Sequence, residues 1–229
     1  MNALTNIWNG LDWSVLTNIL LGVLPSLLCI TLHELSHGYV AYRLGDTTAR
    51  DAGRLTLNPL RHIDPMGLVM MVVFHFGWAK PVPVNMYRFK NPKRDMAVTA
   101  LAGPAMNFVI GIVFLFLYGL LYTPLRQIGS GAGEWLLEML YLTAYISLAF
   151  MIFNILPISP LDGSKILYSF LPDRYYVLLM RYERYGMLLL LLLVWTNVLG
   201  APLSSVTRWV FGKLFFLSEG GFRLYGWLS

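Results

Sequence analysis

Two histidines and a glutamate close the first long apolar stretch of the chain. His33 and His37 stand four positions apart and Glu34 follows the first of them, which is the H-E-x-x-H spacing of zinc hydrolases. Residues four apart lie on one face of a helix, so both imidazoles can bind one metal ion. Glu34 would then lie beside the metal, where it can take a proton from the attacking water as general base.

The position of this run is as informative as its spacing. The eighteen residues from Val15 to Leu32 carry no charge, and the helix that they predict continues through the histidines. An ionisable residue at the centre of a membrane helix costs about 2.5–3.5 kcal/mol on insertion scales, so such residues mark functional sites. We interpret the run as part of an active site at membrane depth, with a purely structural polar cluster as the alternative.

A catalytic zinc ion keeps three protein ligands and one open position, so a third ligand is needed. Asp162 is the strongest candidate, because it follows the third apolar stretch, which returns the chain to the membrane face reached by His37. The alternative role of Asp162 is the N-cap of a helix predicted over 163–171, and the two roles are compatible. Of the other histidines, His62 is expected to be solvated and His75 to be a buried non-ligand.

The elements that must position these residues are membrane helices. The chain is 57% hydrophobic and only 13% charged, whereas about a quarter of the residues of a soluble domain are charged. Four uncharged stretches approach the length of about 20 residues that a span needs: Val15–Leu32, Val98–Tyr122, Met139–Leu161 and Tyr185–Thr207. We predict an all-α polytopic membrane protein with about four transmembrane helices.

Two further segments are apolar but unlike spans. Met66–Ala79 is too short to cross a membrane and leads into a segment with prolines at 81 and 83, which suit an edge strand. Together with Gly53–Leu57 it predicts a small re-entrant β-sheet or hairpin beside the helices. The tail, residues 205–229, mixes aromatic and basic residues and predicts a C-terminal interfacial helix. Asp46, Asp51 and Asp64 lie in the polar loop and are expected to be solvated or turn-forming.

The basic residues predict the orientation. Thirteen of the 17 Lys and Arg residues lie between Arg43 and Arg94 or between Lys165 and Arg184, on the side of the membrane where the motif ends. Cytoplasmic loops carry such an excess, so we expect the active site to face the cytoplasm in a multi-pass protein of the cell membrane. The net charge of +5 is explained in this way, and we expect no nucleic-acid partner. The single cysteine, Cys29, excludes a disulfide framework and a cysteine-based metal site within one chain.

Several motifs together resemble the site-2 protease family of intramembrane zinc metalloproteases, in particular its compact prokaryotic subgroup without PDZ or CBS domains. The runs that carry the resemblance are His33–Gly38, Gly53–Pro59, His62–Pro65, Gly77–Asn85, Ala102–Asn107 and Asn154–Gly163. The resemblance implies a single membrane-embedded domain over residues 1–229. Its catalytic core would cover about 15–171, and a C-terminal helix and interfacial tail about 174–229.

The resemblance also implies roles for individual residues. One Zn²⁺ per chain would be bound by His33, His37 and Asp162, with Glu34 as catalytic base. Asn154 would assist substrate or oxyanion binding, since a side-chain amide can donate to developing negative charge. The substrate-binding segment would contain Trp78, Val82, Val84 and Asn85, and its edge would hold an unwound stretch of substrate by β-augmentation. We interpret Gly103, Pro104 and Asn107 as helix-packing residues.

The expected function is therefore cleavage of peptide bonds in or near transmembrane segments. The partners would be the lipid bilayer and a transmembrane substrate, such as a single-span regulator or a signal-peptide remnant. One alternative is a non-catalytic scaffold or chaperone that keeps the protease fold, although such proteins usually lose the base or a ligand. A zinc transporter is a further alternative, but the second and fourth apolar stretches offer no ionisable residue for a polar path.

Overall fold

The computed structural model describes residues 13–67, 78–129 and 131–228. The regular structure in these ranges is helical, without a strand. The helices are α2 (Trp13–Arg43), α3 (Thr48–Asp51), α5 (Pro92–Gln127), α6 (Gly131–Ile155), α7 (Asp162–Ser169), α8 (Asp173–Trp195), α9 (Gly200–Leu214) and α10 (Phe216–Leu228), with the 3₁₀ turns η1 (Pro59–Arg61) and η2 (Met86–Arg88).

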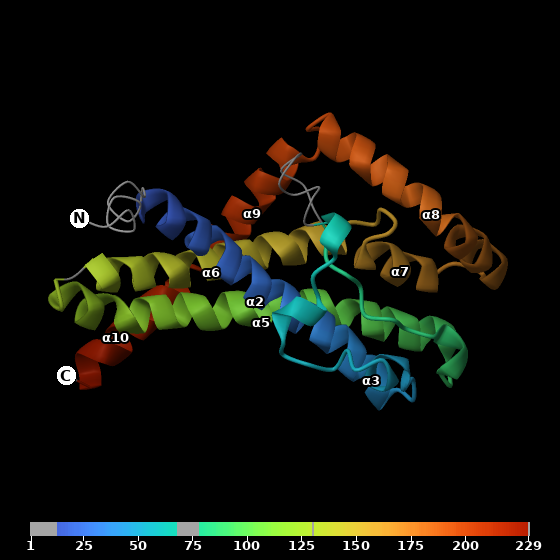
Figure 1. Ribbon diagram of the computed structural model, residues 1–229, viewed down its shortest axis with the longest axis horizontal. Coiled ribbons are helices and arrows are strands. Elements are labelled where there is room, and N and C mark those ends of the chain that lie inside the picture. Colours follow the sequence, from blue (N-terminus) through green and yellow to red (C-terminus); the bar gives the residue numbers. More distant parts are fainter. Residues whose placement is uncertain (1–12, 68–77, 130, 229) are drawn as a thin grey trace, which may run out of the picture.

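Three helices form the centre of the molecule. The helices α5 and α6 lie side by side and α2 crosses both of them (Figure 1). By length and composition, α5, α6 and the part of α2 from Thr17 to Arg43 can each cross a membrane. The first three predicted spans are thereby confirmed as long apolar helices, and the chain is an all-α, multi-pass membrane protein.

Small residues allow α5 and α6 to approach closely. A Cβ added to Gly111 would clash with the side chain of Leu148, which is fully buried. Leu115, Leu148 and Phe211 pack together and extend this core from α5 and α6 to α9. Small residues serve the same purpose in membrane helices generally, because close contact replaces the hydrophobic effect as the source of stability.

The fourth predicted span is not one straight helix. The segment from Tyr185 divides between α8 and α9, and the end of α8 (Tyr185–Trp195) meets the following part of the chain (Gly200–Leu228) at an angle of 84°. The turn contains Asn197, whose φ of 55° lies in the left-handed region that ends many helices. Uniform hydropathy from 185 to 207 concealed this break, because apolar composition reports burial in lipid and not backbone direction.

The C-terminal tail packs on the bundle. A Cβ on Gly119 of α5 would overlap the backbone of Ser218, and one on Gly221 would overlap the backbone of α5. The two glycines let α10 lie directly against α5, and Ser218 is buried between them. The tail therefore contributes to helix packing, which its mixture of aromatic and basic residues did not indicate.

The predicted re-entrant sheet is not seen. Most of Met66–Ala79, including His75, lies outside the described residues. In the neighbouring described part, residues 53–57 form no strand, and one antiparallel bridge joins Ile63 to Ala79. Lys80 donates its N–H to the carbonyl of His62 beside this bridge. The chain from Ala79 to Asn85 is otherwise held by side chains.

Two polar residues of this connection are buried: His62, which was expected to be solvated, and Asp46, which forms one of the turns expected of it. Asp46 is fully buried and accepts hydrogen bonds from the backbone of Thr48 and, at 2.6 Å, from the N–H of Asn85. His62 is 1% exposed, and its Nε2 donates to the Thr56 carbonyl at 2.9 Å. Both side chains form hydrogen bonds with backbone groups that are not paired in a sheet. Internal hydrogen bonding, as well as exposure to solvent, therefore explains why this loop is polar.

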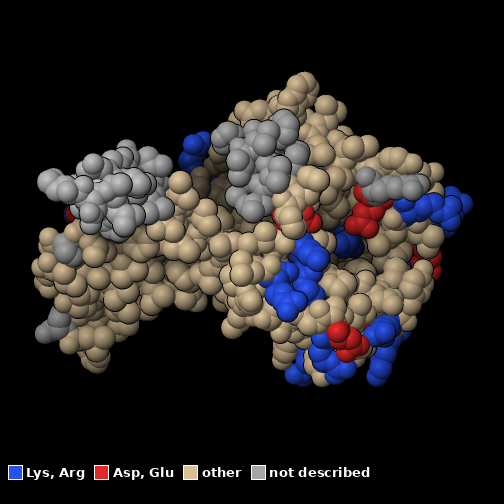
Figure 2. All heavy atoms as spheres, in the orientation of Figure 1, with Lys and Arg blue, Asp and Glu red and all other residues tan. Residues whose placement is uncertain are grey.

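Charged side chains gather at one end of the molecule. Figure 2 shows most of them over the half that contains α3 and the connection from α2 to α5, while the other half of this face is mostly uncharged. The end of α2, the start of α5 and α7 lie in the charged half, and the connection between α5 and α6 lies at the opposite end (Figure 1). Charged side chains thus cover the end of the molecule where α2 ends and α5 begins, which is also the end of α2 that carries the H-E-x-x-H motif.

Candidate metal centre

Three potential ligands converge where α2 meets α7. The Nε2 atoms of His33 and His37 are 3.0 Å apart, and Oδ2 of Asp162 lies 3.1 Å from each of them. Metal–ligand bonds of 2.0–2.1 Å in a tetrahedron separate the ligand atoms by about 3.3 Å. Within the described residues, this trio is the group of His, Cys, Asp and Glu side chains with the spacing for a metal ion. Its two nitrogens and one carboxylate oxygen suit zinc.

The chain leaves helical structure after α6, and this break brings Asp162 close to the two histidines. The helix ends at Ile155, and Asp162 is the first residue of α7 rather than its N-cap, with Leu161 in the extended cap position. The N-cap position is thus taken by Leu161, and the N-cap alternative for Asp162 is wrong. Gly163 makes the turn possible, because a Cβ there would overlap the carbonyl oxygen of Ile155.

Asp162 is in the form that a ligand needs. Burial opposes ionisation of this carboxyl group, but the rings of His37 and His33 outweigh burial and hold its pKa below the ordinary value. Asp162 is therefore a carboxylate that can only accept hydrogen bonds or bind a cation. Only 13% of its side chain is exposed, which keeps competing water away.

The ring of His37 is held in the tautomer that binds metal through Nε2. Its Nδ1 lies 2.7 Å from the carbonyl oxygen of Thr99 on α5, and a carbonyl oxygen can only accept a hydrogen bond. Nδ1 therefore carries a proton, which leaves Nε2 as the nitrogen of this ring that can bind a metal ion. Metal-binding histidines in proteins are oriented by this kind of bond.

Gly103 leaves the space that the two rings occupy. A Cβ at this position would lie 2.6 Å from Cε1 of His33 and from Cε1 of His37. Gly103 is thus a packing residue, as expected, but one whose neighbours are the two candidate ligands. It keeps α5 close enough to α2 for the imidazoles to lie against the helix backbone.

Replacement of Gly103 by alanine is expected to weaken zinc binding at least tenfold, because both rings must move away from their present positions. Zinc affinity measured by competition with a chelator in detergent tests this. Gly22→Ala is a matched control, since a Cβ there meets nothing within 4 Å and alanine favours the helix. Equal zinc affinity in Gly103→Ala and Gly22→Ala would contradict the expectation.

Glu34 is next to the ligands and has a partner of its own. Its Oε2 accepts the N–H of Val82 at 2.8 Å, which links α2 to the segment expected to bind substrate. Val82 is 7% exposed and packs near Gly38, so this amide is not available to a substrate strand in this arrangement. The contact fixes Glu34 through one of its two carboxylate oxygens.

The other predicted substrate-binding residues are not among the three converging ligands. The Asn154 amide donates to the carbonyl of Phe150 in its own helix at 3.0 Å. The side chain of Asn85 accepts the N–H of Tyr87 and caps η2. Val84 packs against the cluster around Ala41 and Phe89, and Trp78 is half-buried. Among the described residues, no acceptor reaches the N–H of Val84.

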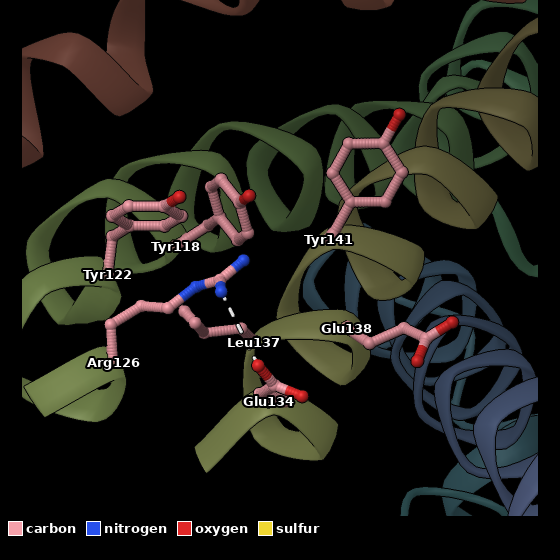
Figure 3. Close-up of a pocket in the computed structure, with 7 residues that line it drawn as sticks. All are labelled: Tyr118, Tyr122, Arg126, Glu134, Leu137, Glu138 and Tyr141. Atoms are coloured by element: carbon pink, nitrogen blue, oxygen red, sulfur yellow. Dashed lines mark hydrogen bonds and ion pairs between the residues drawn. The ribbon is translucent and has the colours of Figure 1, made fainter. Parts of the chain in front are cut away.

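A separate cavity lies towards the opposite end of α5 and α6. It has a volume of about 320 Å³ and is lined by Tyr118, Tyr122, Arg126, Glu134, Leu137, Glu138 and Tyr141. The guanidinium of Arg126 reaches across it to Glu134 at 3.4 Å, beside the two tyrosines of α5 (Figure 3). None of the metal-ligating candidates lines this cavity.

Comparison with known proteins shows the family of the chain. Residues 124–195, which include Asp162, match the model of Peptidase family M50. The chain is 35% identical over 187 residues to "Putative zinc metalloprotease YwhC" of Bacillus subtilis, a match covering 82% of this chain and 83% of that protein. This chain belongs to peptidase family M50.

Other members of the M50 family are similar over most of the chain. The proteins named "Putative zinc metalloprotease Rip2" are 29% identical over 203 residues in Mycolicibacterium smegmatis and 30% identical over 191 residues in Mycobacterium tuberculosis. These matches cover 85% and 81% of this chain, and 76% and 70% of the relatives. No solved structure matches the chain significantly. Membership of M50, the site-2 protease family, makes the chain a membrane-spanning zinc metalloprotease, as its motifs predicted.

Proposed function

We propose that this M50 protease hydrolyses peptide bonds in or near transmembrane segments, with His33, His37 and Asp162 as the zinc ligands. The observation that carries this proposal is the convergence of their three ligand atoms within 3.1 Å of one another, next to an apolar helix bundle. When bound, zinc supplies Lewis acidity, which activates water and polarises a carbonyl group. The positions of the protein side chains decide the remaining steps.

Glu34 acts as general base in this proposal. One of its oxygens is occupied by the Val82 N–H, and the other takes a proton from the attacking water. The same carboxyl group then donates this proton to the leaving amine. Because the Val82 bond fixes the carboxylate, both transfers take place from one side-chain position.

The substrate lies along the segment from Trp78 to Asn85. A transmembrane helix must unwind before its carbonyls can be attacked, and an exposed backbone edge can hold the unwound stretch. The Val82 amide is engaged by Glu34, so the N–H of Val84 is the donor that this edge offers. Asn154 would join the site only after its amide leaves the Phe150 carbonyl, and it would then donate to the oxyanion.

The charged end of the molecule faces the cytoplasm in this proposal. The metal centre is formed by the second half of α2 and the start of α7. The charged side chains gather over the connection from α2 to α5 (Figure 2). The positive-inside tendency then places the site near the cytoplasmic face of the cell membrane. The catalytic core covers about 15–171. The C-terminal part, about 174–229, packs on that core through α9 and α10 and keeps an interfacial outer face, with Trp209 and Trp227 exposed.

Removal of the metal tests the proposed function. The protein is purified in detergent and its zinc content measured, and it is then incubated with single-span membrane peptides before and after treatment with a chelator. We expect about one zinc per chain, cleavage within or next to the apolar segment, loss of cleavage without metal and recovery when zinc is restored. Cleavage that persists in the metal-free protein contradicts the proposal, and zinc binding without any cleavage favours a scaffold.

A further inference from the structure

Asn107 has no role in the chemistry described so far, although it is fully buried beside it. Its side chain lies on α5 with the amide 3.1 Å from Nδ1 of His33. In the orientation drawn, the NH₂ group faces this nitrogen, and the amide oxygen has no hydrogen-bond partner among the described residues. A buried oxygen without a partner in a native protein calls for a physical explanation.

The proton on His33 decides which orientation of the amide is correct. If the Asn107 NH₂ donates to Nδ1, the neutral His33 ring carries its proton on Nε2. That proton would point at His37 and Asp162, and Nε2 could not bind a metal ion. The two ends of an amide differ so little in shape that their assignment follows from the hydrogen bonds they make. Rotation by 180° places Oδ1 of Asn107 on an Nδ1–H of His33.

The second histidine supports the rotated orientation. His37 is held by the Thr99 carbonyl, and Thr99, Gly103 and Asn107 follow each other at intervals of four on one face of α5. On this face, the Thr99 carbonyl would accept a hydrogen bond from one imidazole and the Asn107 side chain from the other. Gly103 lies between these two acceptors and leaves room for the rings. Asn107 is fixed from its other side, because the Ser147 hydroxyl of α6 donates to its backbone carbonyl at 2.8 Å.

We propose that Asn107 is a positioning residue that accepts the Nδ1–H of His33 and so directs the lone pair of Nε2 towards the metal ion. The inference rests on the zinc ligands assigned under the proposed function. It replaces our interpretation of Asn107 as a helix-packing residue. Loss of a supporting hydrogen bond of this kind typically lowers metal affinity 10–100-fold.

Two substitutions separate the hydrogen bond from packing. Asn107→Leu keeps the approximate volume and removes the acceptor, and we expect zinc to bind 10–100-fold more weakly, measured by chelator competition in detergent. Asn107→Asp keeps an acceptor for Nδ1–H and is expected to bind zinc within a few-fold of the parent protein. The melting temperature of each metal-free variant shows whether it has folded. Parental zinc affinity in folded Asn107→Leu, or equal losses in the two variants, overturns the proposal.

The ring of His33 gives a readout that requires no catalysis. Nitrogen NMR of the zinc-loaded parent protein, with ¹⁵N-labelled histidine and a His33→Gln variant for assignment, is expected to show zinc on Nε2 and a proton on Nδ1 of His33. Zinc bound through Nδ1 of His33 overturns the proposal. If zinc affinity and tautomer follow expectation while no membrane peptide is ever cleaved, the role of Asn107 stands and the proposed protease function fails. Zinc affinity unchanged in His33→Ala would instead show that the ligand assignment is wrong.

Discussion

Replacement of Glu34 by glutamine is expected to slow peptide cleavage by about 10²–10⁴-fold, the usual contribution of a general base. Glutamine has nearly the same shape, and its amide oxygen can still accept the N–H of Val82. The amide has no basic lone pair for the proton of the attacking water, however. Because Glu34 is not among the three converging ligand atoms, the zinc content should equal that of the parent protein.

The measurement is a cleavage rate on one membrane peptide together with zinc content on the same sample. Glu138→Gln makes the same chemical change in the cavity at the opposite end of α5 and α6, and it should leave the cleavage rate unchanged. A Glu34→Gln protein that cleaves at the parental rate shows that another group is the base. A Glu34→Gln protein that has lost its zinc shows that this carboxylate belongs to the metal site.

Replacement of Asp162 by asparagine is expected to remove most of the bound zinc. The substitution replaces a carboxylate that lies 3.1 Å from both histidine nitrogens by a neutral amide. Loss of a ligand should weaken zinc binding by more than the roughly 100-fold upper range for loss of a supporting hydrogen bond. Cleavage should fall in proportion to bound zinc and partly recover when excess zinc is added.

Asparagine makes this test specific to ligation. Asn and Asp are equally good N-caps, so an Asp162 whose task was to cap α7 would be replaced without loss. Asp173→Asn is the matched control, since Asp173 is the exposed first residue of α8 and pairs with Lys93. Parental zinc affinity in Asp162→Asn would remove this residue from the ligand set.

The sequence alone determined the class of protein and the side chains of its candidate site. Long uncharged stretches require helices in a membrane, since every backbone polar group there must be paired within the chain. The four-residue spacing of His33 and His37 places two imidazoles on one helical face whatever surrounds them. Asp162 could be inferred because alternating spans return the chain to a known side. Each of these inferences uses local geometry or a simple count of crossings.

The tertiary structure alone decided how those side chains are oriented and held in place. The acceptor for His37 is the Thr99 carbonyl, and the donor to Glu34 is the Val82 N–H. Backbone groups of this kind occur at almost every position, so the sequence does not indicate which of them will form these hydrogen bonds. Gly103 and Asn107 resembled packing residues, because only the approach of α5 to α2 brings them against the histidines. Residue types specify which groups can do chemistry, but their mutual orientation comes from contacts between segments far apart in the chain.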